Sequence, residues 1–99
     1  MEPIFFEVVL ESKDLLTDGF ESRDEIEESL EKALAQSGLG EVTGGGSGMG
    51  KAIIDVEMSL EVSLDDALVF LRETLQRLRV PRSTLIKRHV PQEQVFSIY

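Results

Sequence analysis

One stretch of the chain is rich enough in glycine to bind an anion through its backbone. Seven of the eight glycines lie between Gly38 and Gly50, and the run 45–51 fits the first seven positions of the phosphate-binding pattern G-x-x-x-x-G-K. Backbone N–H groups would hold the anion, with the Lys51 ammonium beside it. The next residue is Ala52, so the hydroxyl that would bind Mg²⁺ is missing, and a strand-like segment follows where a helix is needed. We therefore expect no ATP hydrolysis.

Two interpretations of this segment stay open. The simpler one is a flexible hairpin loop over residues 44–50 that joins two strands. The other is a functional loop that binds a small anion or nucleotide, or that orders when a partner arrives. Its residues would be Gly44, Gly45, Gly46, Ser47, Gly48, Gly50 and Lys51.

Carboxylates form the second group of residues that could do chemistry. In the segment Ile4–Leu10 one face carries Ile4, Phe6, Val8 and Leu10 and the other carries Phe5, Glu7 and Val9, and the segment Ala52–Leu60 alternates in the same way. Both patterns predict strands with one buried face. If the two strands are neighbours, one face carries Phe5, Glu7, Val9, Ile53, Asp55 and Glu57 together. Like charges on adjacent strands repel, so solvent, a basic neighbour such as Lys87 or Arg88, or a bound cation or basic partner must offset them.

Composition excludes several kinds of site. The chain has no cysteine, so a disulfide framework, a thiolate metal site and a cysteine nucleophile are ruled out. Its one histidine, His89, has no carboxylate within three residues of it in the sequence and is expected to be an exposed loop residue. The carboxylates could in principle do acid–base work, but nothing fixes a cleft around them. We expect no enzymatic activity, no metal and no cofactor.

Two helices and further strands are predicted around these residues. Ser22 and Glu25 fit a capping box at the start of a helix that Gly38 ends, and Ser63 opens a second helix that ends at Val80-Pro81. Leu39–Thr43 is expected to be a short strand, Ser12–Gly19 a polar connection, and at least one of the runs Thr84–Ile86 and Val95–Tyr99 a strand.

The element order β-α-β-β-α-β is typical of a ferredoxin-like α+β sandwich. We expect one domain over residues 1–99, with two helices on one face of an antiparallel sheet and a strand order of 4-1-3-2. A fifth, C-terminal strand is an open alternative. The other face of the sheet would be free for solvent or a partner.

Charge is unevenly distributed along the chain. Residues 1–66 carry 17 acidic and 4 basic side chains, a net charge of −13, whereas residues 67–99 carry 2 acidic and 6 basic ones, a net charge of +4; the sum is −9. This balance disfavours nucleic-acid binding, which needs a basic surface. The basic end could bind an anion or support self-association through unlike patches, as in a homodimer.

We therefore expect a non-enzymatic, acidic protein–protein interaction module. One version is an inhibitor or immunity partner of a basic protein, since opposite charge speeds association. The alternative is a small-ligand sensor that uses residues 44–51. No segment is apolar and long enough to be a signal peptide or membrane span, so a cytoplasmic protein without membrane contact is expected.

Overall fold

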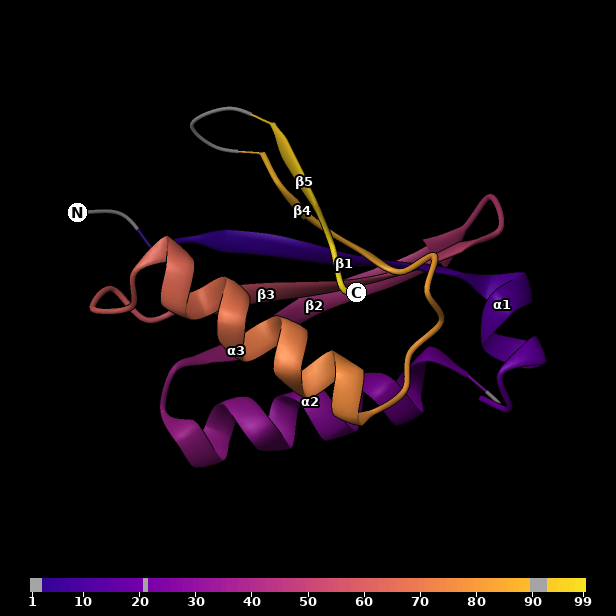
Figure 1. The fold of residues 1–99 in the computed structure, drawn as a ribbon, viewed down its shortest axis with the longest axis horizontal. Helices are drawn as coiled ribbons and strands as arrows, with labels where there is room; N and C mark the ends of the chain where they lie inside the picture. Colours follow the sequence, from indigo (N-terminus) through magenta and orange to yellow (C-terminus); the bar gives the residue numbers. More distant parts are fainter. Residues whose placement is uncertain (1–2, 21, 90–92) are drawn as a thin grey trace.

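The computed structural model describes residues 3–20, 22–89 and 93–99. Within these described residues, five strands and three helices follow one another along the chain (Figure 1). In chain order they are β1 (Phe5–Glu11), α1 (Ser12–Thr17), α2 (Arg23–Ser37), β2 (Gly40–Gly48), β3 (Lys51–Met58), α3 (Leu64–Arg77), β4 (Leu85–Arg88) and β5 (Gln94–Ser97). The class is α+β, as the alternation of periods two and 3.6 predicts.

All five strands form one antiparallel sheet in the order β2-β3-β1-β4-β5. The prediction that β1 and β3 are central neighbours is confirmed, because they pair from Phe5↔Glu57 to Glu11↔Lys51. β4 was expected at the edge, but β5 pairs outside it and takes that place. Both C-terminal apolar runs are therefore strands.

One face of the sheet is covered by α2 and α3, which lie together below it in Figure 1. The alternating residues Phe6, Val8 and Leu10 of β1 are buried on this side, as are Ile54, Val56 and Met58 of β3. They pack against the apolar stripes of the helices, including Ile26, Leu30, Leu34, Leu71 and Leu75. The inward-facing residues predicted from period two are thus confirmed.

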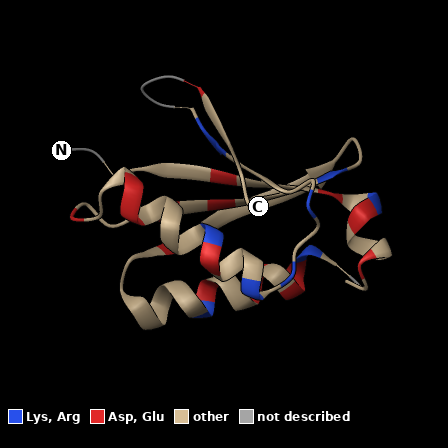
Figure 2. Ribbon diagram, in the orientation of Figure 1, with Lys and Arg blue, Asp and Glu red and all other residues tan. Residues whose placement is uncertain are grey.

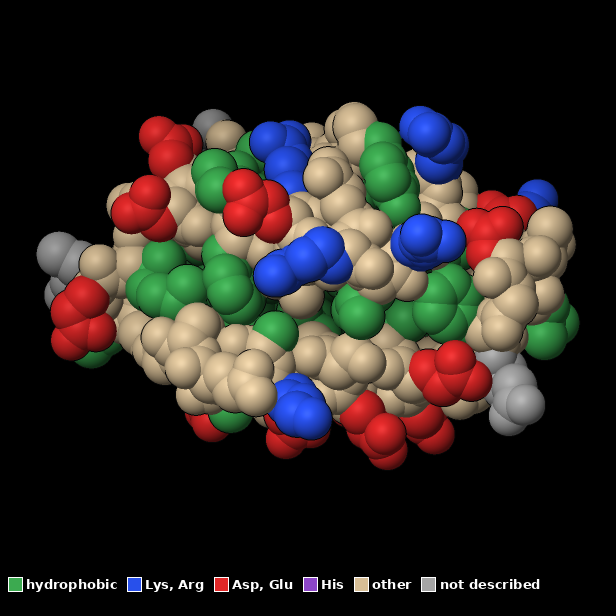
Figure 3. Space-filling view, turned by 60° about the horizontal axis from the view of Figure 1, so that its bottom comes forward, with side chains coloured by type: hydrophobic (Ala, Val, Ile, Leu, Met, Phe, Trp, Pro, Cys, Tyr) green, Lys and Arg blue, Asp and Glu red, His purple; other side chains and the backbone are tan. Residues whose placement is uncertain are grey.

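The helix ends follow from local capping. The Ser22 hydroxyl accepts a hydrogen bond from the Asp24 N–H, and Gly38 ends α2 with a left-handed φ of 72°. The Ser63 hydroxyl accepts from the Asp66 N–H at the start of α3. Figure 3 shows that apolar side chains remain visible along the seam between these helices, with both signs of charge around them.

Two predicted connections are wrong. Ser12–Gly19, expected to be a polar connection, contains the short helix α1, which buries Leu15 against the core. Gly44–Gly48, expected to be part of a hairpin loop, belongs to β2 and pairs with β3. The turn between β2 and β3 is only Met49-Gly50, both with positive φ (52° and 77°), as in the type I′ turn that suits a twisted hairpin.

Candidate binding site on the open face of the sheet

The sheet face turned away from α2 and α3, called here the open face, carries the acidic residues predicted from the sequence. Glu7 lies directly opposite Asp55, and Phe5 lies opposite Glu57. In β2, Glu41 is opposite Glu57, which adds a carboxylate that the sequence pattern did not single out. Figure 2 shows the acidic segments of β1 and β3 next to each other, with the basic segment of β4 above them.

A small hollow of about 210 Å³ lies on this face. Its lining includes Phe5, Glu7, Thr43, Asp55 and His89, drawn from three strands and the segment after β4. The ring of Phe5 is 53% exposed, so the hollow combines an apolar surface with two carboxylates. Such a combination suits the aliphatic stem and charged head of a lysine or arginine side chain.

The Glu7 carboxylate has a hydrogen-bond partner and a basic neighbour within the chain. This carboxylate is in hydrogen-bond contact with the His89 imidazole, which makes an ion pair when the ring is protonated, and Lys87 of β4 stands opposite Glu7 in the sheet register. The expectation that no carboxylate orients His89 is wrong, because the partner lies 82 positions away in the sequence. The prediction that the imidazole is exposed is confirmed, since 51% of the side chain is accessible.

Three other carboxylates of the open face are not compensated in this way. Glu41, Asp55 and Glu57 form no ion pair with any residue that the structure describes. Glu41 and Glu57 also line a second hollow of about 350 Å³ at the N-terminal end of β2, together with Pro3 and Leu60. Three unpaired carboxylates on adjacent strands repel one another and favour a bound positive group.

The apolar part of the predicted face is smaller than expected. Phe5, Val9 and Ile53 were predicted to be exposed together, but Val9 is only 5% exposed and Ile53 is half-buried. Val9 pairs with Ile53 on one side and Leu85 on the other, so its neighbours cover it. Phe5 is therefore the main exposed apolar group among these three.

The glycine segment lies beside the acidic residues as part of β2. Gly44, Gly46 and Gly48 stand opposite Asp55, Ile53 and Lys51 respectively, so bare backbone adjoins the open face. A Cβ at Gly45 would come within 2.3 Å of the Ile53 carbonyl oxygen, which explains this glycine by close approach. At Gly46 a Cβ would meet nothing within 4 Å. The hypothesis that residues 44–51 bind an anion stays a prediction.

The basic C-terminal residues have local roles that the sequence did not reveal. The Arg72 guanidinium donates to the Ser97 carbonyl at 2.9 Å, and that of Arg88 donates to the Gln94 side chain at 3.2 Å. The Arg82 guanidinium lies 5.0 Å from the centre of the Tyr99 ring. These contacts hold the last strand and the C-terminus against α3, β4 and the segment between them.

In the part of the chain that the structure describes, no three His, Asp or Glu side chains come together in a group that could hold a metal ion. Among the same residues no helix has the length and apolar character needed to cross a membrane. The chemistry that the open face offers is the binding of a cationic group by carboxylates.

Comparison with known proteins gives no relative from which a function could be transferred. No family model, no curated protein and no solved structure matches the chain.

Proposed function

We propose that this chain is a non-enzymatic protein-binding module whose open face holds a basic segment of a partner protein. The observation that carries the proposal is the set of three carboxylates, Glu41, Asp55 and Glu57, which lie on adjacent strands without an ion-pair partner among the described residues. The exposed Phe5 ring beside them supplies apolar contact for the stem of a lysine or arginine.

Electrostatics supports the same proposal. Neighbouring carboxylates repel one another. A cationic side chain of a partner lowers this repulsion and is itself attracted to each carboxylate. The overall charge of −9 adds long-range attraction, which speeds the encounter with a basic protein. An inhibitor or immunity role toward a basic protein in the cytoplasm fits this electrostatic character and is the version we favour.

The fold itself is proposed to be a ferredoxin-like sandwich with additions. The proposal is supported by four neighbouring strands, β2-β3-β1-β4, whose order is 4-1-3-2 in reverse, whereas β5 makes the order of the whole sheet different from that arrangement. α1 and the edge strand β5 are then additions to it. Because one fold serves many functions, the fold supports the location of the open face but not what that face binds.

Anion or nucleotide sensing is the weaker candidate. Gly44–Gly48 is extended and paired with β3, whereas an anion-binding nest needs successive N–H groups that converge. The Lys51 ammonium lies 3.9 Å from the Glu11 carboxylate, and Asp55 adjoins Gly44. These negative groups disfavour a phosphate at this position.

The test is a titration with hexa-arginine peptide, followed by calorimetry at low salt. The double variant Asp55→Asn/Glu57→Gln removes two charges from the open face, and Glu28→Gln/Glu31→Gln removes two exposed charges from α2 as a matched control. We expect the first to weaken binding by about tenfold and the second by less than about twofold, on the basis of ~0.2–1 kcal/mol for each exposed pair and more for a clustered one. Equal losses would show binding by net charge alone and refute the proposal.

A further inference from the structure

The outer edge of β2 is a free sheet edge. β2 pairs with β3 on one side only and ends the strand order. Among the described residues, no backbone hydrogen bond reaches the segment 41–48 from its outer side. Its unpaired N–H and C=O groups can therefore pair with another extended chain.

Edge strands in most proteins carry features that prevent such pairing, including lysine, proline, bulges and short length. Gly44–Gly48 contains no proline and no charged side chain, and residues 45–48 are all exposed. The register shift between Val42 and Gly44 is the only irregularity, and it lies at one end of the segment. At the opposite edge, β5 has only four residues. The β2 edge is thus the more accessible of the two.

We propose that Gly44–Gly48 binds an extended, basic segment of a partner protein as a sixth strand of the sheet. This inference rests on the proposed function, because it uses the same acidic face and adds the backbone that would hold the partner. Strand addition of this kind draws affinity from main-chain hydrogen bonds and specificity from alternate side chains.

The glycines determine which partner side chains fit. Gly44 and Gly46 share the open face with Asp55 and Ile53 and place no side chain between them and an incoming strand. The incoming strand would lie two strand spacings, about 9.6 Å, from β3. A lysine or arginine opposite Gly44 can extend over the bare backbone toward Asp55, and an aliphatic residue opposite Gly46 can reach Ile53. The partner motif is therefore a basic residue and an aliphatic residue separated by one position.

A second copy of this chain is a poorer occupant of the edge. Pairing of β2 with β2 would join two open faces into one continuous surface. Each face brings Glu41, Asp55 and Glu57 without ion-pair partners among the described residues, so joining them increases repulsion. Charge complementarity selects a basic strand from another protein.

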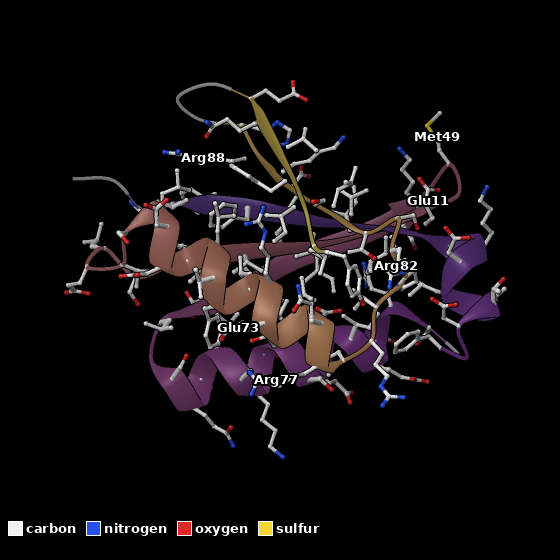
Figure 4. All side chains as sticks on the ribbon, viewed as in Figure 1. Glu11, Met49, Glu73, Arg77, Arg82 and Arg88 are labelled. Atoms are coloured by element: carbon white, nitrogen blue, oxygen red, sulfur yellow. The ribbon has the colours of Figure 1, made fainter. Side chains whose placement is uncertain are left out.

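The fully exposed side chain of Met49 projects from the tip of the β2–β3 hairpin, with the Glu11 carboxylate near the base of the turn (Figure 4). Because the β2–β3 turn contains only Met49 and Gly50, the turn itself does not cover the edge of β2. Residues 45–48 are exposed, which leaves this part of the edge accessible to a partner strand.

The experiment uses the peptide Thr-Lys-Thr-Ile-Thr-Lys-Thr. When it is extended, the lysines and the isoleucine lie on one face and the threonines on the other. The sequence is the same in either chain direction. Two derivatives carry backbone N-methyl groups, one at the four threonines and one at the lysines and isoleucine. Both keep the charge, but only one of them removes the N–H groups that face β2. The full chain is titrated with all three peptides by NMR.

We expect one N-methylated derivative to bind at least about tenfold more weakly than the parent and the other within about twofold. Asp55→Asn should weaken the parent by about threefold or more, the scale of an exposed ion pair. Equal binding by both derivatives, or no binding of the parent peptide, overturns strand addition. The hexa-arginine titration then remains as the separate test of the acidic face. Insensitivity to Asp55→Asn counts against the proposed function, and concentration-dependent dimerisation of the free chain would assign the edge to a second copy instead.

Discussion

Substitution of Gly45 by alanine tests whether the glycine segment is a strand held tightly against its neighbours. The added Cβ would lie 2.3 Å from the Ile53 carbonyl oxygen, where ordinary van der Waals contact begins at 3.4 Å, so the two atoms must separate by about 1.1 Å. The obstacle is backbone of a central strand rather than a flexible side chain. β2 must therefore shift away from β3.

A second contact is affected at the same place. The Arg23 guanidinium donates to the Ile53 carbonyl at 3.3 Å, and its Nη1 atom would be 3.2 Å from the new Cβ. Overpacking typically destabilises by about 1–3 kcal/mol, and a weakened hydrogen bond to a charged group adds to this. We expect Gly45→Ala to lower the free energy of unfolding by about 2–3 kcal/mol, equivalent to a Tm lower by about 10–20 °C for a domain of this size.

Gly46→Ala is the matched control because a Cβ at Gly46 has no atom within 4 Å and its φ is not positive. It should leave stability unchanged or raise it by up to about 1 kcal/mol, since alanine restricts the unfolded chain. Urea unfolding followed by far-ultraviolet circular dichroism measures both variants. If the two differ by less than about 0.5 kcal/mol, the segment is not paired as described and the reasoning is refuted.

Three other variants test separate parts of the structure. Met49→Asn should stabilise the fold by about 0.5–1 kcal/mol in urea unfolding, because asparagine tolerates the positive φ of the hairpin turn better than methionine; a lower stability would contradict the turn. Tyr99→Phe removes the hydrogen bond that the phenol donates to the Val80 carbonyl at 2.6 Å and should destabilise by about 1 kcal/mol. An unchanged urea midpoint would mean that the C-terminus does not dock there. His89→Ala frees the Glu7 carboxylate and should strengthen hexa-arginine binding by about two- to threefold in calorimetry, whereas weaker binding would place the imidazole itself in the site.

The strongest periodic patterns were sufficient to predict the core of the fold. β1 and β3 place their main core residues at every second position, α2 and α3 have serine caps and apolar stripes, and the structure agrees with each. These signals are local, so one sequence is enough to find them. Because β1 and β3 were placed side by side, Glu7 could be predicted to lie near Asp55 or Glu57, and the observed register places it opposite Asp55.

The glycines of β2 are the reason that the length of this strand could not be predicted. A strand is recognised by side chains that alternate between two faces, and glycine has none. Gly45 is in the strand because its missing Cβ allows the close approach of Ile53, a contact that only the folded chain shows. The same absence explains why the turn was placed over seven residues instead of two.

Contacts between distant residues could not be predicted from local patterns. His89 meets Glu7 across 82 positions, and Arg72 meets the Ser97 carbonyl across 25. The burial of Val9 likewise depends on β4, whose position beside β1 follows from sheet pairing. Each of these contacts forms only in the folded chain, so no local sequence pattern could predict it.

Amide hydrogen exchange reports directly on strand addition at β2, because it observes the backbone of this strand. The full chain is measured residue by residue with and without the alternating lysine–isoleucine peptide. Strand addition predicts that those amides of residues 44–48 that point away from β3 exchange at least about tenfold more slowly in the complex, while those of the α2 surface keep their rates. Binding of the peptide with no change in exchange at 44–48 would contradict it.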